Sequence, residues 1–158
     1  MALFKEMIEQ SPGTEPVECA EVVYRALKKS GEQGEPIPSE AFMRRVRGLE
    51  SEEAVSLSRR KYVTARECRL KLNRMHGTAS LHVGRVRDLP FGFDVSPDPR
   101  RDEGGAVVDP GHCLLMNLPD PVTDEESAEV AASQLVKIAR HVTPDQEKQE
   151  DRERYGST

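Results

Sequence analysis

Few side chains in this sequence are suited to acid–base chemistry, and the histidines are the first to consider. There are four of them. His82 lies in an alternating segment and His112 opens a later apolar run, so the pair can meet across a sheet as acid and base on a phosphate ester, or as metal ligands. No His-x-His, His-Glu-x-x-His or Cys-x-x-Cys spacing accompanies them. The alternative is that His82 faces solvent and His112 is bonded to its own turn.

The segment Asp109-Pro-Gly-His-Cys113 places a carboxylate, an imidazole and a thiol within five residues. Adjacent side chains on a strand point to opposite faces, so Cys113 faces inward if His112 faces outward. We therefore expect Cys113 to be a buried structural cysteine rather than a nucleophile. Serine-hydrolase and nucleotide-binding motifs are lacking. We assign no catalytic residue, no metal and no cofactor, and we expect a non-catalytic protein.

Charge is distributed unevenly along the 158 residues. Residues 44–87 hold 12 basic and 4 acidic side chains, whereas residues 1–43 hold 4 and 8, and residues 88–158 hold 7 and 16. Arginine dominates the basic middle, and its guanidinium binds phosphate or carboxylate in a bidentate fork. The acidic flanks either fold back and neutralise this segment, or the segment faces an anionic partner. The candidate binding residues are Arg44, Arg45, Arg47, Arg59, Arg60, Lys61, Arg66, Arg69, Arg74 and Arg85.

A second protein is the partner that we expect, because arginine is enriched at protein interfaces. The alternative is a component that binds or processes nucleic acid or nucleotides through the Arg-rich face, with His82 and His112 beside it. The isoelectric point near 5.5 and the absence of Trp argue against that alternative. The sequence leaves open whether the protein forms a homo-oligomer. We expect no membrane partner, because no run approaches about 20 apolar residues.

The cysteines and the first residues indicate the compartment. Three cysteines in unrelated contexts do not form a disulfide framework. The opening residues lack the basic region and the apolar run of a signal peptide. We therefore expect a cytoplasmic protein. The apolar Leu3, Phe4, Met7 and Ile8 are free to pack on the domain, on a second copy or on a partner.

Hydrophobic periodicity and turn residues divide the chain into elements. Helical spacing predicts a helix over 14–30, followed by a Gly- and Pro-rich linker over 31–38. Capping boxes at Thr64 and Thr123 predict helices that run to about Met75 and about Ala139. Alternating or continuous apolar runs predict strands over 54–58, 78–86, 91–96 and 112–118.

These elements predict an α+β fold, with a small sheet of about four strands packed against two or three helices. The domain spans residues 36–143. An N-terminal helical segment and linker, residues 1–35, precedes it. Residues 144–158 carry many acidic and almost no apolar side chains, which predicts a disordered tail.

Two short motifs carry a resemblance to known sequences. They are Gly84-Arg-Val-Arg-Asp-Leu89, which we place on a strand, and Asp109-Pro-Gly-His112, which precedes one. With Val55–Ser58 and Phe93–Pro99, their order resembles a group of small uncharacterised bacterial proteins over residues 40–140. The resemblance implies a bacterial cytoplasmic protein that works beside others encoded with it, and our preferred function is a non-catalytic interaction or accessory subunit of such a multi-protein system. The resemblance implies no activity or cofactor, and it leads us to expect a small residue such as alanine at Cys113.

Overall fold

The computed structural model describes residues 11–28 and 36–156. Six strands form one antiparallel sheet in the order β10-β5-β1-β4-β9-β6. This confirms the α+β class, with more strands than the four that were expected. The strands of this sheet are β1 (Val22–Leu27), β4 (Val55–Arg59), β5 (Gly77–His82), β6 (Asp94–Pro97), β9 (His112–Met116) and β10 (Arg140–His141).

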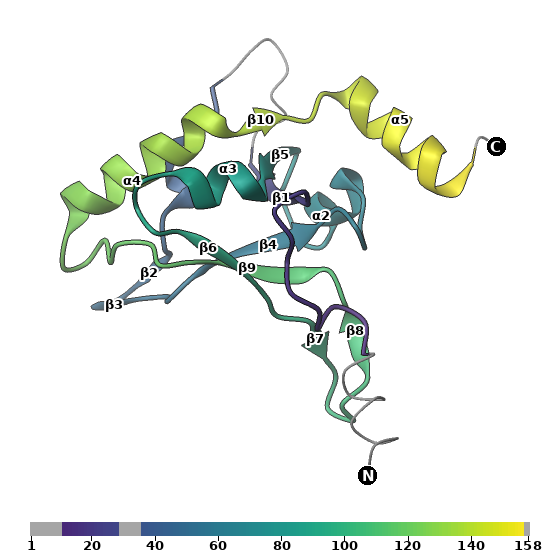
Figure 1. The fold of residues 1–158 in the computed structure, drawn as a ribbon, viewed down its shortest axis with the longest axis horizontal. Helices are drawn as coiled ribbons and strands as arrows, with labels where there is room; N and C mark the ends of the chain where they lie inside the picture. Colours follow the sequence, from purple (N-terminus) through teal and green to yellow (C-terminus); the bar gives the residue numbers. More distant parts are fainter. Residues whose placement is uncertain (1–10, 29–35, 157–158) are drawn as a thin grey trace.

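Two short hairpins extend away from the sheet. In Figure 1 one projects to the left and the other projects downward. They are formed by β2 (Val46–Arg47) with β3 (Glu50–Ser51), and by β7 (Arg100–Arg101) with β8 (Val107–Asp109). The second hairpin lies between the strands that were expected over 91–96 and 112–118.

One face of the sheet, the core face, is covered by helices. Two of them, α3 and α4, lie side by side above the sheet in Figure 1, and α4 also contacts the short η2. The largest fully buried apolar side chains are Phe42, Leu57, Leu81, Leu115 and Leu135. These helices are η2 (Ser39–Phe42), α3 (Val83–Asp88) and α4 (Glu125–Ile138).

Among the described residues, helices cover the opposite face at one end. There α2 (Ala65–Leu70) lies over β1 and β5, and α5 (Pro144–Tyr155) contacts α2. Tyr24, Ala65 and Cys68 form a small second core beneath them. The rest of this face, which we call the open face, carries Ser56 and Leu114, and no helix among the described residues lies over it.

The first strand corrects the helix expected over 14–30. Val22–Leu27 pairs along its whole length with β5, and Val23 and Tyr24 also pair with β4. Val23 and Leu27 are buried on the core face and Tyr24 on the other, so the segment lacks the polar face that distinguishes a half-buried strand. Residues 1–10 and 29–35, which include the expected N-terminal segment and most of the linker, lie outside the described residues.

The strand expected over 78–86 ends at His82, and α3 follows at once. Alternation continues through Val83, but Val83 and Val86 are three residues apart and both fully buried, which is helical spacing. The chain also passes close to Gly84. A Cβ there would lie 3.1 Å from the carbonyl oxygen of Cys19, which is a tight contact.

Residues 144–155 form a helix, which corrects the expected disordered tail. Thr143 caps this helix through a capping box with Gln146, and Pro144 opens it. The expected helix at Thr64 is present with its capping box to Glu67, although it ends at Leu70. The cap of α4 is Asp124, which accepts from the Ser127 N–H, rather than Thr123.

Candidate binding groove on the open face of the sheet

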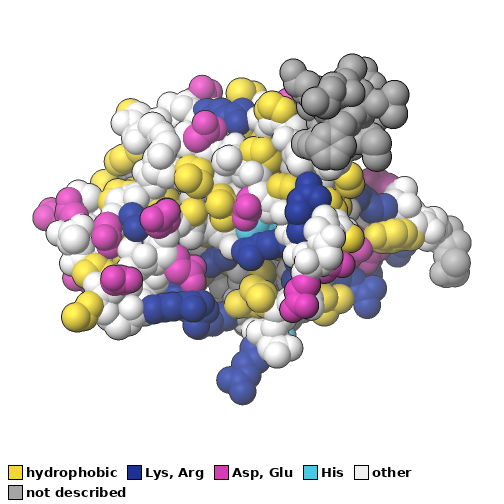
Figure 2. Space-filling view, turned by 90° about the horizontal axis from the view of Figure 1, so that it is seen from below, with side chains coloured by type: hydrophobic (Ala, Val, Ile, Leu, Met, Phe, Trp, Pro, Cys, Tyr) yellow, Lys and Arg dark blue, Asp and Glu magenta, His cyan; other side chains and the backbone are white. Residues whose placement is uncertain are grey.

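A groove with a volume of about 800 Å³ lies on the open face of the sheet. Figure 2 views this side of the molecule, and basic side chains gather around a central hollow in it. Strands β1, β4 and β9 form the floor, the end of α2 forms one wall, and the two hairpins contribute the others. The polar lining residues are Arg25, Arg45, Arg47, Glu52, Glu53, Ser56, Ser58, Lys71, Asp98, Arg100, Asp109 and His112.

Ser58 and His112 form the centre of the floor. They are direct partners in the antiparallel pairing of β4 with β9. The alternation of Val55 and Leu57 toward the core turns Ser58 toward the opposite face, and the pairing brings His112 beside it. Directly opposed residues have Cβ atoms about 5 Å apart, so the hydroxyl and the imidazole lie side by side.

Lys71 reaches the floor from the end of α2. Its Nζ donates to Ser58 Oγ at 3.0 Å and to Asp109 Oδ2 at 2.7 Å. The ammonium is thus held between a hydroxyl and a carboxylate. An ammonium donates hydrogen bonds and accepts none, so in this position Lys71 is suited to bind an anion.

The His112 ring is fixed through both nitrogens. Nδ1 lies 2.9 Å from the Asp98 carbonyl oxygen and 3.0 Å from its Oδ2, while Nε2 lies 3.1 Å from Arg100 Nη2. A guanidinium only donates, so Nε2 accepts and Nδ1 carries the proton. Burial and the charge of Arg100 lower the pKa of His112, although Asp98 opposes them. His112 is therefore neutral at pH 7, and its one lone pair is already engaged.

Three guanidinium groups of the groove have no carboxylate partner among the described residues. Arg25 donates to the carbonyl oxygens of Ala41 and Ser56, Arg100 donates to His112, and Arg45 is exposed. Arg47, by contrast, pairs with Glu52 at 3.0 Å. The groove therefore offers unneutralised positive charge beside hydroxyl donors, an arrangement that attracts carboxylate or phosphate.

The apolar part of the groove is aliphatic. Its lining includes Met43, Leu72, Met75 and Leu114, and no aromatic ring among the residues that the structure describes. Methionine adapts its shape to varied apolar side chains. A nucleobase, which is normally held by stacking on an aromatic ring, finds no such platform here.

Most of the basic residues singled out from the sequence are neutralised within the molecule. The acidic flanks fold back on the basic middle through Glu15, Glu21, Glu147, Glu150 and Asp151. These acidic residues pair with Arg59, Arg60, Lys61, Arg66 and Arg69, whereas Arg47 pairs with Glu52 inside the basic middle. Of the remainder, Arg44 donates to the carbonyl oxygens of Glu52 and Leu118, whereas Arg45, Arg74 and Arg85 are exposed. Only Arg45 and Arg47 of the set line the groove.

The two histidines do not meet. His82 is exposed at the end of β5, and His112 lies in β9 with β1 and β4 between them. Three strand spacings correspond to about 14 Å, which is beyond hydrogen-bond reach. His112 belongs to the groove and His82 does not.

Ser58, Lys71, Asp98 and Arg100 were not among the site residues predicted from the sequence. The serines of Val55–Ser58 were visible as the polar face of a strand, and Asp109 was noted beside His112. Lys71 and Arg100 carried no usable signal, because the fold alone brings the end of α2 and the β7–β8 hairpin to one place. Within 11–28 and 36–156, no group of His, Cys, Asp and Glu is arranged to hold a metal ion.

Comparison of the chain with protein-family models, with curated proteins and with solved structures finds no match in any of the three. A search of the described helices finds none that is both long and apolar enough to cross a bilayer. The geometry of the groove is therefore the basis for the functional proposal.

Proposed function

We propose that this protein is a non-catalytic accessory subunit that binds an acidic segment of a partner protein in the groove on its open face. The observation that carries the proposal is a set of three guanidinium groups, from Arg25, Arg45 and Arg100. Within the described part of the chain they lack a carboxylate partner, while the other basic lining residues have one. Charge complementarity of this kind steers association and selects partners.

Exposed apolar side chains beside the groove support a protein as the partner. Leu49 at the tip of the β2–β3 hairpin is 91% exposed, and Val46 on the same hairpin is 50% exposed. Arg45 and Arg47 lie next to them in the chain. Apolar groups bordered by arginine are typical of protein-binding surfaces, and the aliphatic lining favours peptide side chains over nucleobases.

The hydrogen bonding of the polar groups supports binding rather than catalysis. The lone pair of His112 Nε2 is engaged by Arg100, and the hydroxyl of Ser58 by Lys71. A general base needs a free lone pair within reach of the proton that it removes. The resemblance to small bacterial proteins supports a bacterial, cytoplasmic multi-protein system as the setting.

A displayed library of random peptides tests the proposal without knowledge of the partner. We expect the protein to select peptides with acidic residues next to aliphatic ones. The variants Arg45→Glu and Arg100→Glu should lose this selection. The matched control is Arg85→Glu, which changes an exposed arginine on α3 that does not line the groove.

The library experiment can also contradict the proposal. Failure to enrich acidic peptides would contradict the proposal. Enrichment that Arg45→Glu and Arg100→Glu leave intact, but that Arg85→Glu abolishes, would place binding away from the groove and would also contradict it.

A further inference from the structure

We propose that the centre of the groove binds the phosphate group of a phosphorylated side chain on the partner segment. This inference rests on the proposed function, since the segment that enters the groove carries the phosphate. It adds a chemical class, a tetrahedral oxyanion, and a location, the Ser58–His112 pair.

Two cationic groups lie beside this pair, one bonded to each of its members. Lys71 Nζ lies 3.0 Å from Ser58 Oγ, and Arg100 Nη2 lies 3.1 Å from His112 Nε2. The two floor residues are cross-strand partners, with Cβ atoms about 5 Å apart. An anion placed over the pair therefore has an ammonium near Ser58 and a guanidinium near His112.

Both cations retain donors for a ligand. An ammonium has three N–H bonds, and the contacts of Lys71 with Ser58 and Asp109 occupy two of them. A guanidinium has five, and Arg100 uses one on His112. Phosphate monoesters present three strongly accepting oxygens that point in different directions, whereas a carboxylate presents two in one plane. The oxygens of a tetrahedral group can therefore accept from the ammonium and from the guanidinium at the same time.

The carboxylates at this position orient the cations without cancelling them all. Asp109 pairs with Lys71 at 2.7 Å, and Asp98 bonds to His112. Among the described residues, Arg100 has no carboxylate partner, and neither does Arg25 on β1. These two guanidinium groups add positive charge beside the floor, from which a dianion gains more than a monoanion does.

The test uses inorganic phosphate, O-phosphoserine and acetate as probes at constant ionic strength, with binding followed by NMR of the full chain. We expect saturable binding of both phosphate probes, with amide shifts at Ser58 and His112. We also expect the pKa of His112 to rise on binding, since a dianion then joins Asp98 and Asp109 against Arg100 and Lys71. Acetate should bind at least tenfold more weakly.

Two variants and one control locate the site. Arg100→Gln and Lys71→Gln should each weaken phosphate binding at least tenfold. Arg100 is exposed on a hairpin, so its replacement preserves the fold. The matched control is Arg101→Gln on the same hairpin, whose side chain donates to the Gly105 carbonyl oxygen and does not line the groove. It should leave phosphate binding within twofold.

The outcomes separate this inference from the proposed function. Equal binding of acetate and phosphate, or phosphate shifts that lie away from Ser58 and His112, would overturn the phosphate site. If unphosphorylated acidic peptides bind in the groove while phosphate does not, the proposed function stands and this inference fails. If neither binds, both fail. Binding of free phosphate without O-phosphoserine would identify an inorganic anion as the ligand and would overturn the phosphorylated side chain.

Discussion

Arg59 and Glu21 form a bidentate ion pair that fixes the segment preceding β1 to the end of the sheet. Arg59 Nε lies 2.8 Å from one carboxylate oxygen of Glu21 and Nη2 lies 2.7 Å from the other. The arginine side chain is fully buried. It also donates to the carbonyl oxygens of Gly13, Glu15 and Pro16. One residue of the basic middle therefore organises the acidic flank before it.

Replacement of Glu21 by Gln should destabilise the protein strongly. The change leaves the buried Arg59 charge without its closest carboxylate, and loss of one partner from a buried pair costs about 3 kcal/mol or more. The free energy of unfolding from urea titration measures this loss. The control is Glu18→Gln, an exposed neighbour, for which we expect a change within about 0.5 kcal/mol. Equal stability of the two variants would contradict a structural role for the pair.

Acid should weaken the attachment of the same segment through Glu15. Burial raises the pKa of this carboxyl, but hydrogen bonds from Tyr62 and Lys61 and the charge of Arg59 outweigh burial and lower it from 4.5 to about 2. A carboxyl whose pKa is lower in the folded state stabilises the protein at any pH above its pKa in the unfolded state. For Glu15 this stabilisation is lost as the pH falls from about 4.5 to 2.

The pH dependence of the melting temperature tests this expectation. Glu15→Gln should flatten the fall in melting temperature between pH 4.5 and 2, relative to the wild type. Glu103→Gln changes an exposed carboxylate in the β7–β8 hairpin and should leave the profile unchanged. If the melting temperatures of Glu15→Gln and of the wild type fall in parallel, Glu15 is not the cause of the loss of stability in acid.

The three cysteines should differ in reactivity toward iodoacetamide. Cys19 is exposed, whereas Cys68 and Cys113 are buried. Burial raises the pKa of Cys68, and it raises that of Cys113 to about 12. Because the thiolate is the reacting form, we expect mass spectrometry of the native protein to find modification at Cys19 alone, and at all three after denaturation. Rapid modification of native Cys113 would revive a nucleophilic role for it.

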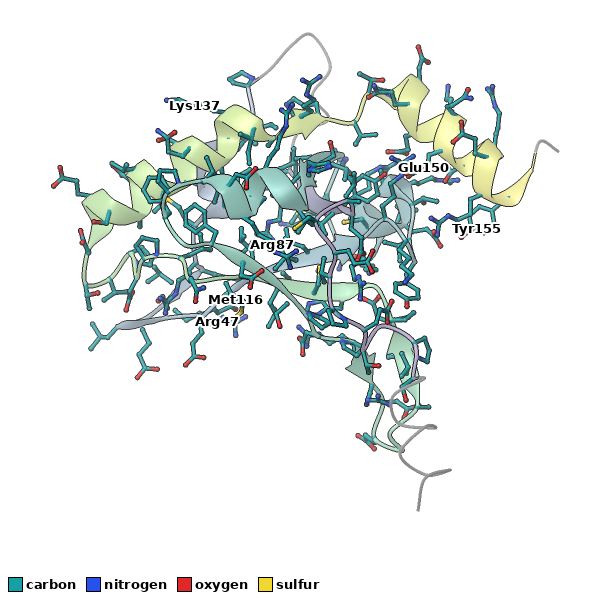
Figure 3. All side chains as sticks on the ribbon, in the orientation of Figure 1. Arg47, Arg87, Met116, Lys137, Glu150 and Tyr155 are labelled. Carbon is teal, nitrogen blue, oxygen red and sulfur yellow. The ribbon has the colours of Figure 1, made fainter. Side chains whose placement is uncertain are left out.

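Helix α5 should detach when Glu150 is replaced by Ala. Its carboxylate is buried on the inner side of the helix (Figure 3), where it accepts from Tyr24 and from the Ala65 N–H and pairs with Arg60. We expect faster amide exchange over residues 144–155 and unchanged exchange in β1 and β4. Glu153→Ala, on an exposed position of the same helix, is the control. Exchange that rises equally in both variants would exclude Glu150 as the anchor.

Local signals in the sequence predicted part of this structure. The Thr64 capping box and the alternation of Val55–Ser58 each depend on only a few neighbouring residues. The helix and the strand that they predicted are both present. The strand β1 was missed because side chains on both of its faces are buried. Helix α5 was missed because its apolar content is negligible and its stability comes from distant pairs such as Glu147 with Arg69 at 2.7 Å.

The candidate site was harder to predict than the elements. Its members come from β1, β4, β9, the end of α2 and two hairpins, and only strand pairing brings them together. Charge arithmetic identified the basic middle, but most of those arginines serve internal ion pairs. Arg25 and Arg100, which have no carboxylate partner among the described residues, lie in the acidic flanks. A count of net charge by segment therefore did not single them out.

Chemical-shift mapping with the strongest peptide from the displayed library is the most direct test of the central claim. We predict that amide shifts on titration concentrate at Ser56, Ser58, His112 and Leu114 on the floor of the groove, and that they vanish in Arg100→Glu. Shifts confined to α2 and α5, or persistence of the floor shifts in Arg100→Glu, would contradict binding of an acidic segment through the unneutralised guanidinium groups of the groove.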